Sequence, residues 1–286
     1  MKIDINTKMI TLLGKPLGQS FAARMQNAGY EAAGLNMLYF YTEVDKDHLG
    51  DVVNGLRYMN FAGFAVTKPN KVRVLRYLDE LDPLCKKMGA SNTVVKTPEG
   101  KLIGYNTDGV GFYTSLVEEG KINVEESTFF CFGAGGAGRA MCSVLAYHGA
   151  KKIYITDFYE PCAESLVMDI NENFAPVAEL VHHGDYAKIA ECNVVMNASG
   201  IGMGSTIGQT PMPVEHIQPG QFYFDACSNP DKTQFLLNAE EKGCQVLNGL
   251  GMSLYQGAAQ IELWTGEKAP VEAMRKELMD ILAESK

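Results

Sequence analysis

The sequence lacks the patterns that mark membrane, secreted and nucleic-acid-binding proteins. No apolar run approaches the roughly 18 residues that a membrane span needs, and the N-terminal segment MKIDINTKMITLLG lacks the layout of a signal peptide. The sequence has no block of Lys and Arg, and its net charge of -9 argues against a nucleic-acid surface. We therefore expect a cytoplasmic protein that binds neither membranes nor nucleic acid.

Metal and disulfide frameworks are also missing. The seven cysteines are scattered and include no CxxC pair, which favours small buried side chains over a zinc or disulfide framework. The adjacent His182 and His183 lie in a polar stretch, and no third ligand stands at a useful spacing. We expect a solvated loop at this pair and no metal site.

The chain does contain alternating strand and helix signals along its 286 residues, a length near which one hydrophobic core divides into two. The expected strands are Met9 to Leu13, Met37 to Tyr41, Phe61 to Val66, Asn92 to Val95 and Leu102 to Tyr105, then four that begin near residues 128, 152, 193 and 222. The expected helices are Phe21 to Ala33, His48 to Met59, Thr107 to Glu119, Arg139 to His148, Ser253 to Thr265 and Pro270 to Glu284. This alternation predicts a two-domain α/β protein with mostly parallel sheets.

A glycine-rich string lies between the strand near residue 128 and a helix. Residues 133–138 read GAGGAG, and the residues expected to contact a dinucleotide are Gly133, Ala134, Gly135, Gly136, Ala137 and Gly138. Glycine serves the tight turn, the close approach of a pyrophosphate and the packing of helix on strand. Asp157 ends the next strand, near the spacing of roughly 20 residues expected of an acid that binds a ribose hydroxyl. The order of these elements predicts a dinucleotide-binding domain.

Two further strings supply an ionisable pair. Residues 63–71 read GFAVTKPNK and residues 104–109 read GYNTDG, which places Lys71 and Asp108 among turn residues. Taken singly, each is more typical of a surface lysine after a proline turn and of a helix cap. Together they suit hydride transfer on an alcohol, because Lys71 can accept the hydroxyl proton while Asp108 accepts a hydrogen bond from the substrate.

With these strings in place, the chain resembles the shikimate/quinate dehydrogenase family almost from end to end. The matching segments, in order, are 14–20 (GKPLGQS), 67–71 (TKPNK), 89–93 (GASNT), 105–109 (YNTDG), the glycine string, 197–203 (NASGIGM) and 248–252 (NGLGM) followed by Gln256 and Gly257. The resemblance implies a substrate domain and a Rossmann-type doubly wound nucleotide domain. We expect the substrate domain at residues 1–106, the nucleotide domain at 107–240, and C-terminal helices at 241–286 that return to the substrate domain.

The resemblance also implies roles for individual residues. Lys71 and Asp108 match the catalytic acid/base pair. Neutral side chains suited to ring hydroxyls are Ser20, Thr67, Asn92, Asn106 and Gln256, although turn stabilisation is as typical a role for the two asparagines. The positions expected to bind cofactor, besides the glycine string and Asp157, are Asn197, Ser199, Gly249 and Met252.

The sequence departs from the family pattern in the substrate and cofactor regions. Ala22 replaces a second serine that helps to bind the substrate carboxylate in the family, and Ser228 replaces a tyrosine. After Asp157 the chain reads FYE, where relatives that use NADP typically carry Asn-Arg, so we expect NAD to be preferred over NADP.

We therefore predict an oxidoreductase, either a monomer or a homodimer, that transfers hydride between NAD and a cyclic polyhydroxy carboxylate of the shikimate or quinate type. A family member acting on another cyclic polyol or an amino-substituted analogue is the alternative. A non-catalytic NAD-binding sensor is less consistent with the paired Lys71 and Asp108.

Overall fold

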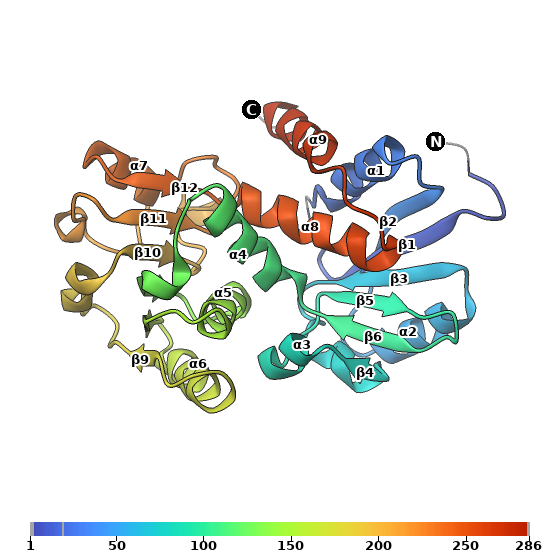
Figure 1. Ribbon diagram of the computed structural model, residues 1–286, viewed down its shortest axis with the longest axis horizontal. Coiled ribbons are helices and arrows are strands. Elements are labelled where there is room, and N and C mark those ends of the chain that lie inside the picture. Colours follow the sequence, from blue (N-terminus) through green and yellow to red (C-terminus); the bar gives the residue numbers. More distant parts are fainter. Residues whose placement is uncertain (1–2, 19, 285–286) are drawn as a thin grey trace. The chain divides into compact units, whose positions relative to one another are not determined.

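The structure is a computed structural model that describes residues 3–18 and 20–284. It divides into two compact units, one formed by Met1–Thr107 with Leu254–Lys286 and the other by Asp108–Ser253. Each unit is built on its own six-stranded sheet with helices packed against it, which confirms the predicted fold class (Figure 1). Gln19, part of the first family segment, lies outside the described residues.

The sheet of the first unit has the strand order β2-β1-β3-β5-β6-β4. Its strands are β1 (Lys8–Gly14), β2 (Met37–Glu43), β3 (Phe61–Val66), β4 (Glu80–Leu81), β5 (Thr93–Lys96) and β6 (Leu102–Tyr105). β1, β2 and β3 are parallel, whereas β5 runs antiparallel to both of its neighbours. The start of β5 therefore lies at the same edge of the sheet as the carboxyl ends of β3 and β6.

Helices from both parts of the chain cover this sheet. They are α1 (Ala22–Ala32), α2 (Leu49–Tyr58), α3 (Pro83–Met88), α8 (Leu250–Thr265) and α9 (Val271–Glu284). The Trp264 indole of α8 donates to the Val94 carbonyl of β5 at 3.0 Å, and Gln260 bonds both Gln26 of α1 and Thr93. Helix α9 packs on α1 (Figure 1). The C-terminal helices thus complete the core of the first unit.

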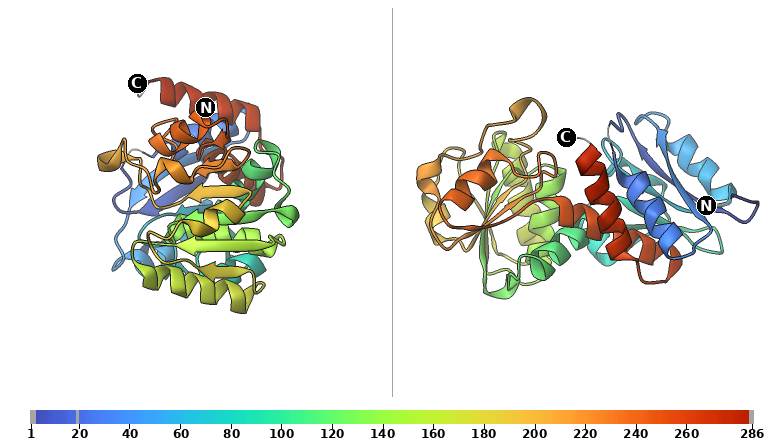
Figure 2. Two further views of the ribbon diagram at one scale, coloured as in Figure 1. Left: turned by 90° about the vertical axis from the view of Figure 1, so that its left-hand side faces the viewer. Right: turned by 90° about the horizontal axis from the view of Figure 1, so that it is seen from above.

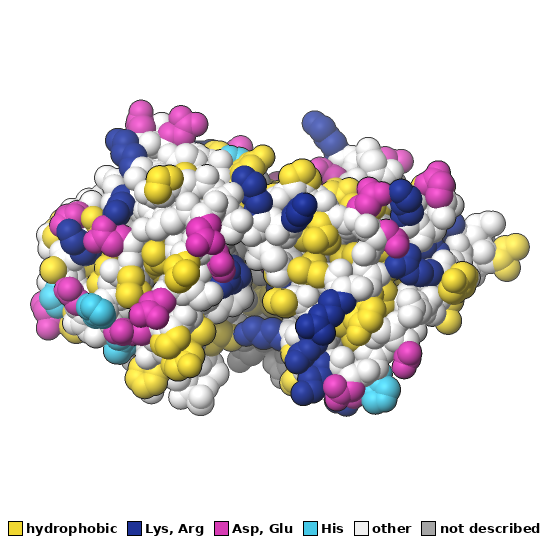
Figure 3. Space-filling view, turned by 90° about the horizontal axis from the view of Figure 1, so that it is seen from below, with side chains coloured by type: hydrophobic (Ala, Val, Ile, Leu, Met, Phe, Trp, Pro, Cys, Tyr) yellow, Lys and Arg dark blue, Asp and Glu magenta, His cyan; other side chains and the backbone are white. Residues whose placement is uncertain are grey.

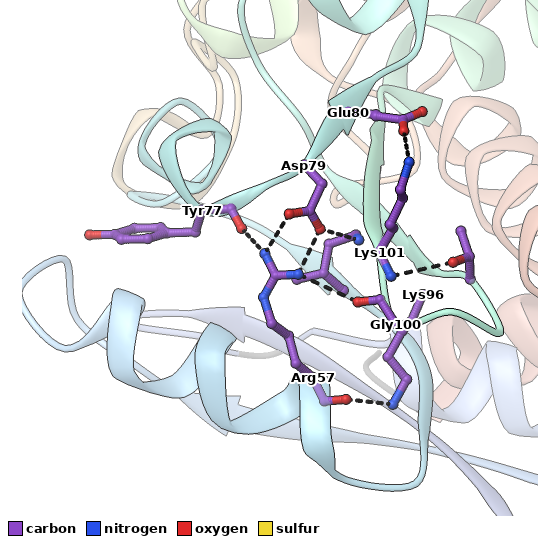
Figure 4. A network of polar contacts seen from close by, with 9 residues as sticks. Arg57, Tyr77, Asp79, Glu80, Lys96, Gly100 and Lys101 are labelled. Atoms are coloured by element: carbon purple, nitrogen blue, oxygen red, sulfur yellow. Dashed lines mark hydrogen bonds and ion pairs between the residues drawn. The ribbon is translucent and has the colours of Figure 1, made fainter.

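A polar network holds the edge of this sheet against α2 (Figure 4). Arg57, near the end of α2, donates to the Asp79 carboxylate and to the carbonyls of Tyr77 and Gly100. Lys96 donates to the Met59 carbonyl at 2.6 Å, next to the last turn of α2. The Arg57 guanidinium holds the pKa of Asp79 below its usual range. The network satisfies carbonyls where a helix ends, which is a structural role.

The second unit carries a parallel sheet with the strand order β12-β11-β10-β7-β8-β9. Its strands are β7 (Thr128–Phe132), β8 (Lys152–Thr156), β9 (Ala178–Leu180), β10 (Val194–Asn197), β11 (Phe222–Asp225) and β12 (Gln245–Leu247), and its helices are α4 (Thr107–Glu118), α5 (Gly136–Tyr147), α6 (Glu160–Asn173) and α7 (Gln234–Glu241). Helices lie on both faces (Figure 2). Strand order reverses between β7 and β10, and a doubly wound sheet binds ligands at such a switch point.

The expected boundary at residue 241 is wrong. β12 pairs in parallel with β11, so residues 241–253 belong to the second unit rather than to a returning C-terminal segment. A three-residue edge strand is too short to show a recognisable alternation of side chains, which is why the sequence did not reveal it. The chain returns to the first unit only at Leu254, inside α8.

The surface and the cysteines complete the description. Acidic and basic side chains intermingle on the left of the face shown in Figure 3, whereas a row of Lys and Arg crosses its right-hand part. Six cysteines are buried and Cys162 is exposed. Within residues 3–18 and 20–284, no helix has the length and apolar character required to cross a membrane.

Candidate active site

The structure brings several predicted substrate residues together at the carboxyl end of β3. Thr67 follows that strand, and its N–H donates to the Leu13 carbonyl of β1 at 2.9 Å. The Val66 N–H donates to the Asn92 carbonyl at 2.8 Å. The Lys71 carbonyl accepts the Ser91 N–H at 2.9 Å, so the turn that carries Lys71 lies beside the start of β5.

Asn92 is the centre of a buried polar cluster. Its side chain is 3% exposed, and its Oδ1 accepts the Thr107 N–H at 2.7 Å and the Thr93 hydroxyl at 2.9 Å. Its Nδ2 donates to the Thr107 hydroxyl at 3.0 Å and to Gln256 Oε1 at 3.3 Å. The cluster joins β5, the start of α4 and α8. Asn92 thereby fixes the backbone one residue before Asp108.

The other two predicted substrate residues lie at loop positions. Asn106 donates from Nδ2 to the Ala90 carbonyl at 3.0 Å and is buried. Ser20 Oγ accepts the Ala22 N–H at 3.3 Å, just before α1. The Ser20 contact is the local turn bond that serine commonly makes, whereas the Asn106 contact ties two segments that lie 16 residues apart.

Sequence reasoning missed Tyr41. Its hydroxyl donates to the Ser20 carbonyl and accepts the Ala23 N–H at 2.9 Å, so it holds the segment that presents Ser20. In a strand, residues two apart point to the same face of the sheet. The spacing of Tyr39 and Tyr41 in β2 could therefore have predicted two tyrosines on one face.

Asp108 lies in the first turn of α4 and is the first residue of the second unit. A carboxylate at this position is favoured by the positive end of the helix dipole. Asp108 is only partly buried, unlike Thr107 before it. The hydrogen bond from the Thr107 N–H to Asn92 fixes the backbone next to Asp108. Asp108 is therefore the next residue in sequence after the polar cluster of the first unit.

The glycine string fits a dinucleotide pyrophosphate. A Cβ at Gly138 would lie 1.9 Å from the Gly133 carbonyl oxygen, so close packing requires glycine there. Gly133, with a φ of +101°, would place a Cβ 2.6 Å from the Ser199 nitrogen. A Cβ at Gly135 or Gly136 would meet no atom within 4 Å. The outer side of the turn is therefore open, and α5 begins at Gly136 with its unpaired N–H groups at that end.

The structure begins α5 three residues before the expected start at Arg139, so Gly136, Ala137 and Gly138 are helical. Ala134 is buried beside them in the turn, and its N–H donates to Asp157 Oδ2 at 2.7 Å. The other oxygen of Asp157 accepts the Tyr159 N–H at 2.9 Å. Asp157 therefore braces the glycine turn against the loop after β8.

A cavity of about 480 Å³ opens beside this brace, at the carboxyl ends of β7, β8 and β10. Its lining includes Gly133, Thr156, Asp157, Phe158, His183 and Ser199. The Thr156 hydroxyl is buried and has no hydrogen-bond partner among the residues that the structure describes. His182 and His183 are exposed in a loop, as expected, and His183 also lines the cavity. His182 is exposed and pairs with Glu160.

Asn197, a predicted cofactor residue, does not line this cavity. Its side chain is fully buried, its Nδ2 donates to the Ile201 carbonyl and to Asp225, and its Oδ1 accepts the Ser199 hydroxyl at 2.6 Å. All of these bonds are internal, so Asn197 shapes the loop that carries Ser199.

The two cofactor positions near β12 differ in their surroundings. A Cβ at Gly249 would lie 2.2 Å from the Ala226 carbonyl oxygen, which gives this glycine a packing role. Met252 lies half-buried in the first turn of α8.

Comparison with known proteins gives the family. Residues 12–94 match the model of the shikimate dehydrogenase substrate binding domain, and residues 249–279 match that of the shikimate 5'-dehydrogenase C-terminal domain. A curated shikimate dehydrogenase (NADP(+)) from Desulforamulus reducens is 39% identical, over 97% of this chain and 96% of that protein. The chain belongs to the shikimate dehydrogenase family. It is an oxidoreductase of the shikimate/quinate dehydrogenase type.

Solved structures agree with this family. Shikimate 5-dehydrogenase from Listeria monocytogenes, in complex with shikimate and NAD, has a TM-score of 0.92 at 37% identity and covers 97% of this chain and 98% of its own. Quinate dehydrogenase from Corynebacterium glutamicum, in complex with NAD, has a TM-score of 0.90 at 28% identity, with 96% and 99% covered.

The expected preference for NAD is wrong. Curated relatives that are 35% to 39% identical are named shikimate dehydrogenase (NADP(+)), although some structural neighbours carry NAD. The preference was inferred from the absence of an Asn-Arg pair after Asp157 and from the Asp157 carboxylate as an acceptor for the ribose diol. In the structure both carboxylate oxygens of Asp157 already accept backbone N–H groups, so the acid has a bracing role that its place in the sequence did not reveal.

Proposed function

We propose that this protein interconverts a ring hydroxyl and a ketone of a cyclic polyhydroxy carboxylate, with a nicotinamide dinucleotide as the redox partner. The bound nicotinamide would supply the hydride acceptor. The glycine string and the start of α5 would hold its pyrophosphate. The fit rests on the open side of the turn at Gly135 and Gly136.

The chain's own residues handle the proton and the orientation of the substrate. Lys71 accepts the hydroxyl proton as the alcohol is oxidised and returns it in the reverse direction. Asp108 accepts a hydrogen bond from the same hydroxyl. A positioned acid/base group of this kind typically contributes about 10² to 10⁴ in rate.

The observation that carries this proposal is the polar cluster around Asn92. It links the turn of Lys71, through the Ser91 N–H, to the backbone immediately before Asp108, through the Asn92 carboxamide. Two strings far apart in the sequence are therefore tied to one set of hydrogen bonds. Gln256 belongs to this cluster, and Thr67 directly follows Val66, whose N–H donates to the Asn92 carbonyl. Both side chains are suited to bind ring hydroxyls.

The proposal is tested by Lys71→Ala and Asp108→Asn. Each variant should lower kcat by at least about 10², with dinucleotide affinity little changed, because each side chain acts on the reacting hydroxyl rather than on the cofactor. Lys86→Ala, which removes a cation from an exposed position on α3, is the matched control and should turn over as the wild type does. A Lys71 or Asp108 variant at near wild-type rate would refute its assigned role.

The second candidate function is the same reaction on a different substrate. Ala22 and Ser228 replace hydroxyl-bearing residues, whereas Lys71 and Asp108 match the family strings. The same chemistry on another cyclic polyol, or on an amino-substituted analogue, follows if recognition of the carboxylate has been lost.

A further inference from the structure

Phe158 carries an exposed aromatic ring at the mouth of the cavity in the second unit. Its side chain is 87% exposed, and it follows Asp157 directly at the carboxyl end of β8. A single exposed phenylalanine is common on protein surfaces and proves nothing alone. Here, however, the ring lines a cavity of about 480 Å³ that also borders the glycine turn.

A second aromatic ring holds Phe158 in place. The His183 imidazole lies 5.4 Å from the Phe158 ring centroid, with an angle of 79° between the ring planes, which is the edge-to-face geometry that aromatic pairs prefer. The loop that carries His183 is itself anchored, because the His183 N–H donates to Glu160 Oε1 at the start of α6. The Phe158 ring therefore contacts the His183 ring and is otherwise largely exposed.

A polar residue also lies beside the cavity. Thr156 lines it and is 3% exposed, and its buried hydroxyl has no partner within the described residues. An occupant with a flat aromatic ring would cover the exposed Phe158 face. Aromatic side chains stack on bases of every kind, because every base has a π-face.

We propose that Phe158, supported by His183, stacks on the adenine ring of the nicotinamide dinucleotide. This inference rests on the proposed function, because the dinucleotide is the redox partner named there. The adenine ring is common to NAD and NADP, so the Phe158–His183 pair sets affinity for both cofactors and does not discriminate between them.

The test is calorimetric titration of the full chain with ADP-ribose, which carries the adenine without the nicotinamide. Phe158→Ala should weaken binding by about 5- to 150-fold, the fold-change for losing one base–aromatic stack, whereas Phe158→Trp should bind at least as well as the wild type. Tyr159→Ala removes the neighbouring exposed aromatic ring, which does not line the cavity, and should leave binding unchanged.

His183 is a positioning residue, and its variants separate orientation from chemistry. His183→Ala should weaken ADP-ribose binding, and His183→Phe, which restores a ring against Phe158, should recover it. In turnover assays, Phe158→Ala should raise KM for both dinucleotides by a similar factor while kcat is held. Turnover with nicotinamide mononucleotide, which has no adenine, should be unaffected by Phe158→Ala.

Two results would overturn the inference: wild-type protein that does not bind ADP-ribose, or a Phe158→Ala variant that binds it as tightly as the wild type. Failure of the proposed function looks different. Wild-type protein that binds ADP-ribose through Phe158 but oxidises no cyclic polyol would contradict the proposed reaction and leave the adenine site standing.

Discussion

Ala22 allows a test of how a charged substrate group is recognised. It opens α1, and its N–H donates to the Ser20 hydroxyl oxygen at 3.3 Å. A serine at this position would add a second hydroxyl beside Ser20. A carboxylate short of hydrogen-bond donors in a protected site binds weakly, because desolvation of the charge is not offset.

We therefore predict that Ala22→Ser raises kcat/KM for shikimate by about ten- to a hundredfold, the value of roughly one hydrogen bond to a charged group. The measurement is steady-state kinetics on shikimate. Ala32→Ser, at the opposite end of the same helix, is the control and should change nothing. The account is contradicted if wild-type kcat/KM already lies within about 10⁴ to 10⁸ M⁻¹s⁻¹ and the new serine does not improve it.

Asp225 gives a test of stability at the residue scale. Burial raises the pKa of its carboxyl, although bonds from the Thr233 hydroxyl, the Cys227 N–H and Asn197 favour the ionised form. The folded protein therefore holds this proton more tightly than the unfolded chain does. Its contribution to stability is present below the unfolded pKa near 3.8 and is lost as the pH rises through the raised folded value.

Asp225→Asn should remove this dependence. We expect the variant to be less stable by about 1 to 3 kcal/mol, because an amide N–H₂ then faces groups that donate to the carboxylate. The deficit should be largest at low pH and should shrink as the pH rises. Urea unfolding from about pH 4 to 8 measures it, with the exposed Asp47→Asn as control. A deficit that grows with pH would show the assigned direction to be wrong.

At the scale of elements, the sequence predicted the helices and strands whose apolar residues recur at a regular spacing. α4 begins at Thr107 and β3 spans Phe61–Val66, as expected. The missed strands β4, β9 and β12 have two or three residues, too few to show alternation, and they pair through backbone groups that any sequence supplies. The early start of α5 was missed because glycine disfavours helix, yet close packing on Gly133 requires it there.

Site residues could be predicted where their chemistry follows from the residue type and the local sequence motif. They could not be predicted where their role depends on contacts with distant segments. Lys71 and Asp108 could be named from the sequence alone, as the basis of a proposal. The burial of Asn197, the engagement of Asp157 by backbone N–H groups and the place of His183 at the cavity all depend on contacts between segments distant along the chain. No local pattern reports such contacts.

At the scale of the whole molecule, the proposed reaction draws on both units. The proposed substrate residues Thr67, Asn92 and Gln256 belong to the first unit, and the glycine string belongs to the second. Lys71 lies in the first unit, and Asp108 is the first residue of the second. The family was readable because its segments are spread over both units.

The most direct test of the central claim is a turnover assay that follows the absorbance of reduced nicotinamide. Wild-type protein and Lys71→Ala would be compared on shikimate, quinate and other cyclic polyols, each with NAD and with NADP. The account predicts turnover of at least one cyclic polyhydroxy carboxylate by the wild type and a loss of at least about 10² in kcat in the variant. Turnover of none of them with either dinucleotide, or turnover that does not depend on Lys71, would contradict it.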